Sequence, residues 1–201
     1  MVPMIARMET KRMRQAAQRG FTLIETMISI VILIVGVLGL AMMLGTGLTY
    51  MNASQDDYIA QQKASEAVES IFTARDQGQA TWSTICNASS AVCASGIFVT
   101  GAQPLCDPGV DGIVGTADDF NGTVCRGNAD AILAPNAAGN FNPPVRLALT
   151  TFTRTIVVSA AVDNSGNPIA NLRQIQVTVT YSNGKWTNRS YTLTTYISNF
   201  S

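Results

Sequence analysis

The stretch that decides the fold is residues 21–44, which read FTLIETMISIVILIVGVLGLAMML. From Met27 to Leu44 it holds 18 residues without a charge or a proline. A helix of about 20 apolar residues spans the hydrocarbon core of a bilayer, whereas the apolar core of a secretory signal runs only ~7–15 residues. The sequence therefore predicts a membrane-spanning helix.

The charges on either side of this helix are unevenly placed. The first 20 residues hold one acidic and five basic side chains, which are Arg7, Lys11, Arg12, Arg14 and Arg19. A basic flank of this kind predicts a cytoplasmic N-terminus, with the body of the chain across the membrane. The chain totals 13 basic and 13 acidic residues, so the body is mildly acidic, which does not favour a nucleic-acid-binding body.

Composition also excludes several chemistries. The 201 residues include no His, which rules out a Ser-His-Asp triad, a Cys-His pair and a His-ligated metal. Charged residues make up 13% of the chain, about half of the usual ~25%. No other catalytic constellation is present, so we do not expect an enzyme.

Glu25 is the one charge inside the apolar stretch. A carboxylate in lipid is costly, and such residues usually have a partner. One interpretation is a plain membrane anchor in which Glu25 reaches the headgroups. The other follows from the residues just before it, Arg19-Gly20-Phe21.

The run from Arg19 to Glu25 resembles the processing site of type IV prepilins and pseudopilins. The shared pattern is a basic leader, a Gly before the cut, a Phe after it, and a Glu at the fifth mature residue. The resemblance implies that a membrane prepilin peptidase removes residues 1–20 by cutting between Gly20 and Phe21, and that Phe21 becomes N-methylated. Glu25 would then neutralise the N-terminal amine of a neighbouring subunit and set the register between subunits.

The helix is expected to continue beyond the membrane, over residues 22–75. Small or apolar residues recur at helical spacing at positions Ala53, Ala60, Ala64, Ala67, Ile71 and Ala74. Polar residues, Lys63 and Glu66 among them, are expected on the opposite face, and Gly78 is the predicted stop. The sequence thus divides the helix into a membrane half (21–48) and an amphipathic spine (49–77).

Residues 78–145 are predicted to be irregular, and they contain all four Cys residues. An even number of Cys residues outside the cytoplasm indicates disulfides. Three pairings are possible, of which Cys86–Cys93 and Cys106–Cys125 are favoured because both close short loops. A zinc site is the alternative, but the region has neither a CxxC pair nor a His.

Within the second loop, residues 107–119 read DPGVDGIVGTADD. Carboxylates on a glycine-punctuated turn suit calcium, which takes six to eight oxygen ligands; the alternative is a pair of Asx-turns with solvated carboxylates. The part from Asp111 onward resembles the calcium loop of major type II secretion pseudopilins, although that loop lies near their C-terminus. The resemblance implies side-chain ligands from Asp111, Asp118 and Asp119, with an oxygen from Thr116.

From residue 146 to 201 the pattern becomes strand-like. The run 145–162 is β-rich, the run 174–181 reads QIQVTVTY with apolar residues alternating on one face, and 189–198 follows after an Asn-Gly turn at 182–185. We expect an antiparallel sheet of three or four strands covering the alanine stripe. The fold class is therefore α+β, a long N-terminal helix packed on a sheet, with a disulfide-stapled loop region.

The closing hairpin resembles the last hairpin of PilV-type minor pilins and related pseudopilins. Together with the processing site, this implies a minor pilin of a type IV pilus, placed in the inner membrane with a periplasmic head. Its expected partners are prepilin peptidase, the lipid bilayer, other pilins and the inner-membrane assembly platform. The alternatives are a minor pseudopilin of a type II secretion system, and a filament-displayed adhesin or DNA-uptake subunit acting through loop 76–145. The head's basic residues are scattered, so no strong nucleic-acid signal is present.

Overall fold

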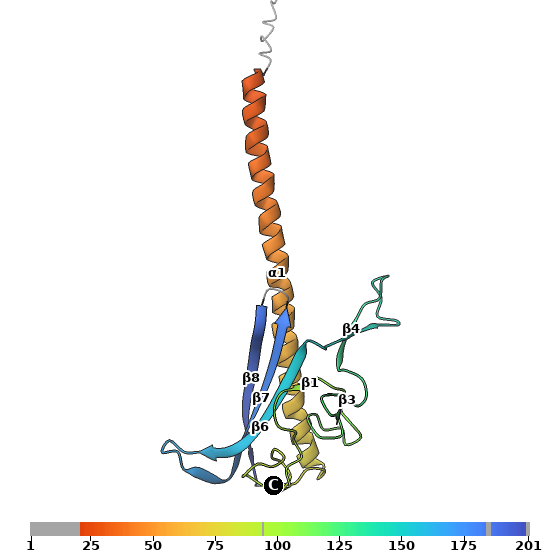
Figure 1. The fold of residues 1–201 in the computed structure, drawn as a ribbon, viewed down its shortest axis with the longest axis vertical. Helices are drawn as coiled ribbons and strands as arrows, with labels where there is room; N and C mark the ends of the chain where they lie inside the picture. Colours follow the sequence, from red (N-terminus) through yellow and green to blue (C-terminus); the bar gives the residue numbers. More distant parts are fainter. Residues whose placement is uncertain (1–20, 94, 184–185, 200–201) are drawn as a thin grey trace, which may run out of the picture. The chain divides into compact units, whose positions relative to one another are not determined.

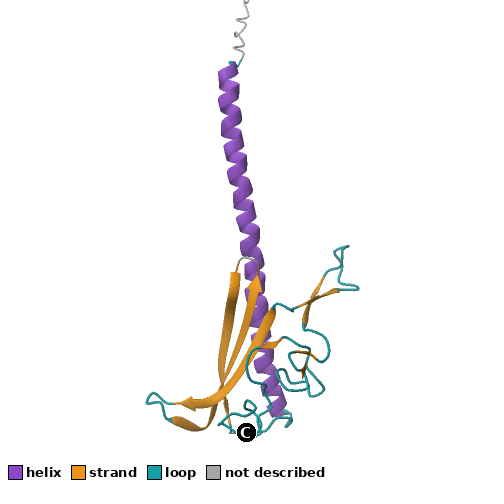
Figure 2. Cartoon of the chain, viewed as in Figure 1, coloured by secondary structure: helices purple, strands orange, loops and turns teal. Residues whose placement is uncertain are grey.

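The computed structural model describes residues 21–93, 95–183 and 186–199. The described residues form two compact units, which divide after Leu48. The elements, drawn in Figures 1 and 2, are α1 (Leu23–Asp76), β1 (Gln103–Pro104), β2 (Phe120–Asn121), β3 (Val124–Cys125), β4 (Ala131–Ala134), β5 (Val145–Ala148), β6 (Phe152–Val162), β7 (Pro168–Asn183) and β8 (Trp186–Ser198).

Local sequence explains where α1 begins and ends. The Thr22 carbonyl accepts hydrogen bonds from the backbone N–H groups of Glu25 and Thr26, and a Thr at this position suits an N-cap. At the other end Gly78 adopts a left-handed conformation with φ of 74°, and the N–H of Gln79 bonds back to the Ala74 carbonyl. Gly is preferred in this type of helix C-terminal turn. The helix therefore ends just before Gly78, as the sequence predicted.

In the first unit, the described residues 21–48 form the beginning of α1. Among the described residues, α1 is the one helix long and apolar enough to cross a membrane by length and composition, and none of its apolar window is buried within the chain. Every side chain from 21 to 48 is exposed. An apolar surface of this size requires lipid or protein to cover it.

The second unit, residues 49–201, has its own core. The rest of α1 buries the predicted stripe, with Ala60, Ala64, Ala67 and Ile71 fully covered. A four-stranded antiparallel sheet in the order β1-β6-β7-β8 supplies the other side of the core. Along β7 the alternating residues Ile175, Val177, Val179 and Tyr181 are buried, as the period-2 pattern predicted.

The β-rich run 145–162 is two strands rather than one. β5 pairs with β4, in the register Ile132↔Leu147, and the two form a separate hairpin. The chain then turns at Leu149, whose carbonyl accepts from the Phe152 N–H, before β6 begins. Leu149 is buried in the core, so this apolar residue holds a turn where the sequence pattern alone suggested a continuing strand.

Candidate functional site

The candidate processing site lies at the N-terminal end of α1. Gly20 falls outside the described residues, whereas Phe21 and Glu25 are described and both are exposed. Glu25 sits in the first turn of α1, where a negative charge interacts favourably with the helix dipole. The side chains of Phe21 and Glu25 are therefore accessible to other molecules, which both the predicted cleavage and the predicted pairing require.

The acidic loop brings together the three predicted carboxylates. Oxygens of Asp111, Asp118 and Asp119 all lie within 4.8 Å of one another. The loop also makes hydrogen bonds of its own: Asp119 accepts from the backbone N–H groups of Gly109 and Gly115, each at 2.6 Å. Asp118 accepts from the Thr116 hydroxyl and from the Asp111 N–H. The donor set suits a hard divalent cation, and the same carboxylates organise the turn.

The pKa values of the two neighbouring carboxyl groups, Asp118 and Asp119, shift in opposite directions. Burial raises the pKa of Asp119 above its ordinary value; the N–H groups of Gly115 and Gly109 oppose this shift, and the negative charge of Asp118 adds to it. For Asp118 partial burial acts upward, but hydrogen bonds from the Thr116 hydroxyl and the Asp111 N–H bring the pKa below its ordinary value. Of the pair, Asp118 is therefore the one better suited to stay ionised and exposed to a ligand.

A buried charge cluster that the sequence did not predict lies behind this loop. Lys63 is 7% exposed and bonds to Glu66 and Asp130, each at 2.7 Å. Burial tends to lower the pKa of Lys63, but the hydrogen bonds to Asp130 and Glu66 raise it above its usual value. Nearby, the guanidinium of Arg154 is buried, and within the described residues its Nη1 and Nη2 have no hydrogen-bond partner. Burial lowers the pKa of Arg154, and the charges of Glu66, Asp130 and Asp119 oppose that effect.

The placement of Lys63 corrects the sequence expectation. Lys63 was expected on the polar face of the helix, but it lies three residues after Ala60 and four before Ala67, so it shares their buried face. Its charge is accommodated because Asp130, the residue just before β4, pairs with it at 2.7 Å. The position of Lys63 within the spacing of the alanine stripe indicates a buried side chain, although Lys was assigned to the polar face because it is charged.

Two disulfides cross-link the loop region, and their pairing is the one predicted from the short loops that they close. Cys86 pairs with Cys93, and Cys106 with Cys125, with Cα–Cα distances of 6.3 and 5.3 Å. The second one closes the segment that carries the acidic loop. Such cross-links stabilise mainly by restricting the unfolded chain.

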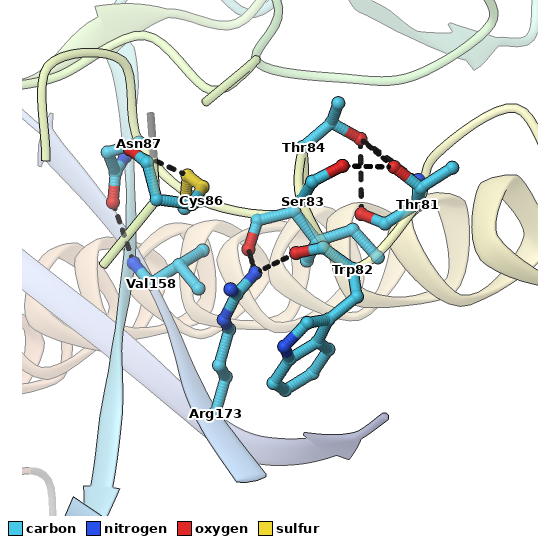
Figure 3. Close-up of a disulfide and its surroundings, with 10 residues drawn as sticks. Thr81, Trp82, Ser83, Thr84, Cys86, Asn87, Val158 and Arg173 are labelled. Carbon is cyan, nitrogen blue, oxygen red and sulfur yellow. Dashed lines mark hydrogen bonds between the residues drawn. A yellow bond between two sulfur atoms is a disulfide. The ribbon is translucent and has the colours of Figure 1, made fainter. Parts of the chain in front are cut away.

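The first disulfide anchors a segment that covers one edge of the sheet (Figure 3). Next to Cys86, the Asn87 side chain donates to the Ile156 carbonyl and accepts from the Val158 N–H, both at 2.7 Å. Arg173 of β7 donates to the carbonyls of Trp82 and Ile85 and lies 4.0 Å from the centre of the Trp82 ring. These contacts hold an irregular segment against β6 and β7 without further strand pairing.

Comparison with known families assigns the N-terminal part of the chain. The prokaryotic N-terminal methylation motif matches residues 15–41, a segment that contains Gly20, Phe21 and Glu25. Searches of curated proteins and of solved structures found no match. The motif supports membership of the type IV prepilin and pseudopilin family, as the sequence predicted. The match does not distinguish a pilin from a pseudopilin.

Proposed function

We propose that the chain is a minor pilin, a structural subunit that enters a type IV pilus through its apolar helix. The observation that carries this proposal is the methylation motif at residues 15–41 on a helix whose apolar window has no residue buried within the chain. Such a helix needs other helices or lipid around it. Prepilin peptidase cuts after Gly20 and leaves an N-methylated Phe21.

In this proposal Glu25 directs assembly. After cleavage the chain begins with a cationic amine at Phe21, and Glu25 lies one helical turn further along. In a filament core an unpaired charge is expensive, so the carboxylate of one subunit pairs with the amine of the next. The pair fixes the axial register of neighbouring helices and involves no covalent chemistry by the chain, which we propose has no catalytic role.

The proposed topology places the N-terminus in the cytoplasm and residues 49–201 in the periplasm. The basic leader supports this orientation, because positive flanks stay on the cytoplasmic side. The two disulfides support it independently, since disulfides persist in the oxidising periplasm and are rare in the cytoplasm. The chain then moves from the inner membrane into the filament with the help of the assembly platform.

A second candidate within the same family is a minor pseudopilin of a type II secretion system. The acidic loop supports a link to secretion systems, because Asp111, Asp118, Asp119 and Thr116 resemble the calcium loop of major type II secretion pseudopilins. The carboxylates of the three Asp residues also converge. Under this proposal the loop binds calcium through those residues. A bound ion would add positive charge that favours the ionised carboxylates.

Intact-mass measurement and N-terminal sequencing of membrane-extracted protein test the main proposal. The protein is purified from cells with and without prepilin peptidase. We expect a chain that begins at methylated Phe21 only where the peptidase is present. A chain beginning at Met1 in both strains would contradict the proposal and leave a membrane anchor with a β-rich head.

A further inference from the structure

The two edges of the four-stranded sheet differ in how they are covered. On one side β1 pairs with β6, and the Asn87 side chain bonds to two further backbone groups of β6. On the other side β8 is the last strand in the order and, among the described residues, pairs with β7 alone. Figure 1 shows β8 at the side of the sheet away from β6. The described chain therefore covers one edge and leaves the other open.

The hydrogen bonds show which backbone groups of β8 face outward. The Asn199 N–H donates to the Asn171 carbonyl at 2.9 Å, and from there the register with β7 runs without a shift as far as Arg189. In an antiparallel ladder every second residue turns both its N–H and its C=O toward the same neighbour. The odd-numbered residues of β8 therefore bond to β7, and the even-numbered residues direct both groups away from it.

This outward edge is closed at its two ends. Near the start of β8 the Asn188 N–H donates to the Ser182 hydroxyl at 3.2 Å. At the other end Arg75 donates to the Ser198 carbonyl, also at 3.2 Å, as expected for an even-numbered carbonyl that points outward.

Between these ends lies an open stretch, which we call the β8 window. The window comprises the even-numbered residues Ser190, Thr192, Thr194 and Tyr196. Within the described part of the chain, no hydrogen bond engages their outward backbone groups. The window therefore presents alternating donors and acceptors that a further chain can satisfy.

The window lacks the features that usually protect a sheet edge. Natural edges are short, or carry charges, prolines or bulges. Residues 190–199 contain neither a charge nor a proline, and the register along them has no shift. A helix bonds its own backbone groups internally, whereas an extended chain offers N–H and C=O groups at the same two-residue period as the window. The geometry therefore favours a strand as the occupant.

Apolar side chains beside the window are only partly covered. On β8, Tyr191 and Leu193 pack against the core but remain partly exposed, whereas the corresponding side chains of β7 are fully buried. On α1, Val68 and Phe72 are likewise partly buried. We call these four residues the apolar strip.

The strip lies where α1 borders β8. Asp57 bonds near the start of β8 and Arg75 bonds at its end, so α1 and β8 run in the same direction. These two residues are about five helical turns apart and share one face of α1. Val68 lies between them on that face, and the Phe72 ring lies 5.9 Å from the Arg75 guanidinium. A strand added beside β8 would cover this strip.

We propose that the β8 window binds an extended segment of a partner protein, which joins the sheet as a further strand. The segment is uncharged and alternates apolar with polar residues. Its apolar side chains cover the apolar strip, and its polar side chains continue the hydroxyl-rich outer face of β8. The backbone ladder supplies affinity, and the alternating side chains supply specificity. Such binding is separate from assembly through the apolar helix, because it gives the head a recognition site of its own.

A second copy of this chain does not fit the window. Antiparallel pairing of two β8 strands would point the two α1 helices in opposite directions, whereas under the proposed topology both enter one membrane from the same side. Parallel pairing would place the helices on opposite faces of the joined sheet, so that each apolar strip adjoined the polar face of the other copy. The occupant is therefore a segment of a different protein.

A synthetic peptide tests the window on the wild-type chain extracted in detergent. The probe has the sequence of residues 174–180, QIQVTVT, with blocked termini. This segment of β7 already pairs with residues 190–196 from the inner side, so its alternation suits the outer side as well. We expect it to bind and to slow hydrogen exchange at the outward N–H groups of the window. No binding, or binding without this protection, would overturn the proposal.

Two methylated peptides serve as matched controls. With the apolar side chains on the strip, the residues that bond to the window are the polar ones, because directly opposite residues share a face. N-methylation of Gln176 and Thr178 should therefore abolish binding, whereas N-methylation of Val177 and Val179 should leave it. Equal binding of the two methylated peptides would contradict strand addition.

Photocrosslinking in cells tests the natural partner. The photoreactive residue p-benzoylphenylalanine replaces Thr192, Thr194 or Tyr196 in turn, and in a control it replaces Val157, which is 42% exposed on β6. We expect the three probes, but not the control, to attach to one segment of another protein. The attached residue, located by peptide mass spectrometry, should move by two positions for each step along β8. Attachment to β8 of a second copy, attachment without this register, or none would overturn the proposal.

A pair of variants at one position isolates the backbone contribution. Thr194→Pro removes an outward N–H that no bond to β7 requires, and proline is tolerated at such edge positions. Thr194→Ala keeps the N–H. We expect T194P to weaken peptide binding about tenfold, a change of ~1.4 kcal/mol, and T194A to stay within about twofold of wild type. Equal binding by the two variants would overturn the proposal.

Folding and function are controlled separately. Mass measured before and after reduction shows whether each variant retains both disulfides, and if T194P does not, the methylated peptides on the wild-type chain decide. Peptide binding requires neither cleavage after Gly20 nor filaments. Its failure would therefore end the strand-addition proposal and leave the proposed function untouched.

Discussion

Residues 21–48 and residues 49–201 both contain many apolar side chains, but only the second region buries them within the chain. Every side chain of the first region is exposed within the chain. The second region buries its alanine stripe beneath a sheet and adds two disulfides. The head is therefore stabilised by contacts within the chain, whereas the apolar helix needs other molecules to cover it. Variants in the two regions should therefore change different measurements.

The largest effect is expected from Glu25→Ala in the helix. It should leave cleavage after Gly20 intact but reduce filament incorporation by about tenfold or more, because the partner amine then lies unpaired in an apolar core. The measurement is the ratio of protein in sheared filaments to protein in membranes. Glu69→Ala, an exposed acidic position in the head part of α1, is the matched control. Normal incorporation of E25A would disprove the pairing.

In the head, Ile71→Ala should lower the stability of the fold without changing cleavage. Ile71 is fully buried, and deleting such a side chain typically costs ~2–5 kcal/mol in unfolding free energy. Cleavage and membrane insertion should be unchanged, because they depend on the other region. Thermal unfolding of the detergent-extracted chain measures the loss, with the exposed Val35→Ala as control. An equal loss in both variants would show that the two regions do not behave independently.

Removing the second disulfide should cost slightly less. For Cys106→Ser with Cys125→Ser we expect a loss of about 3 kcal/mol, the usual value for a loop of roughly this length. The bond closes a sequence separation of 19 residues. Denaturant unfolding of the double variant against wild type gives the difference. If the two unfold at the same midpoint, the staple does not stabilise the head.

Alkaline pH should weaken the head through Tyr181. Burial and a hydrogen bond donated to Asp57 raise the pKa of Tyr181 from 10.0 to about 12. A raised pKa means that the folded state favours the protonated phenol, so this contribution is complete below pH 10 and is lost as the pH rises toward 12. Tyr181→Phe removes that component, so its stability should vary less over this window. Identical pH profiles for the two proteins would exclude the effect.

The smallest effect concerns the acidic loop. If calcium binds, saturating ion should raise the melting temperature by a few degrees, since a ligand at ten times its Kd adds ~1.4 kcal/mol. EGTA should reverse the rise, and Asp118→Asn should abolish it. Magnesium at equal concentration is the control for ionic strength. A melting temperature that EGTA leaves unchanged would contradict the calcium proposal.

The sequence predicted the features that depend on local pattern. The helix, the buried face of β7 and the favoured cysteine pairs all follow from periodicity or from loop length. The β4–β5 hairpin was not predicted, because β4 has four residues and its partner β5 comes after a ten-residue connection. The spacing of Lys63 within the alanine stripe does indicate its buried face, but its partner Asp130 lies 67 residues away in the sequence and was not predicted. Pairing over such distances leaves no local pattern to read.

The Asn87 side chain has a consequence for how the head avoids self-association. With one donor and one acceptor toward β6, it imitates a strand and occupies backbone groups that another chain would otherwise pair with. The residue beside it, Cys86, is locked to Cys93. Formation of the Cys86–Cys93 disulfide and protection of the β6 edge are thereby linked. A reduced head, still waiting for its oxidising compartment, is the form we expect to be open to aggregation through this edge.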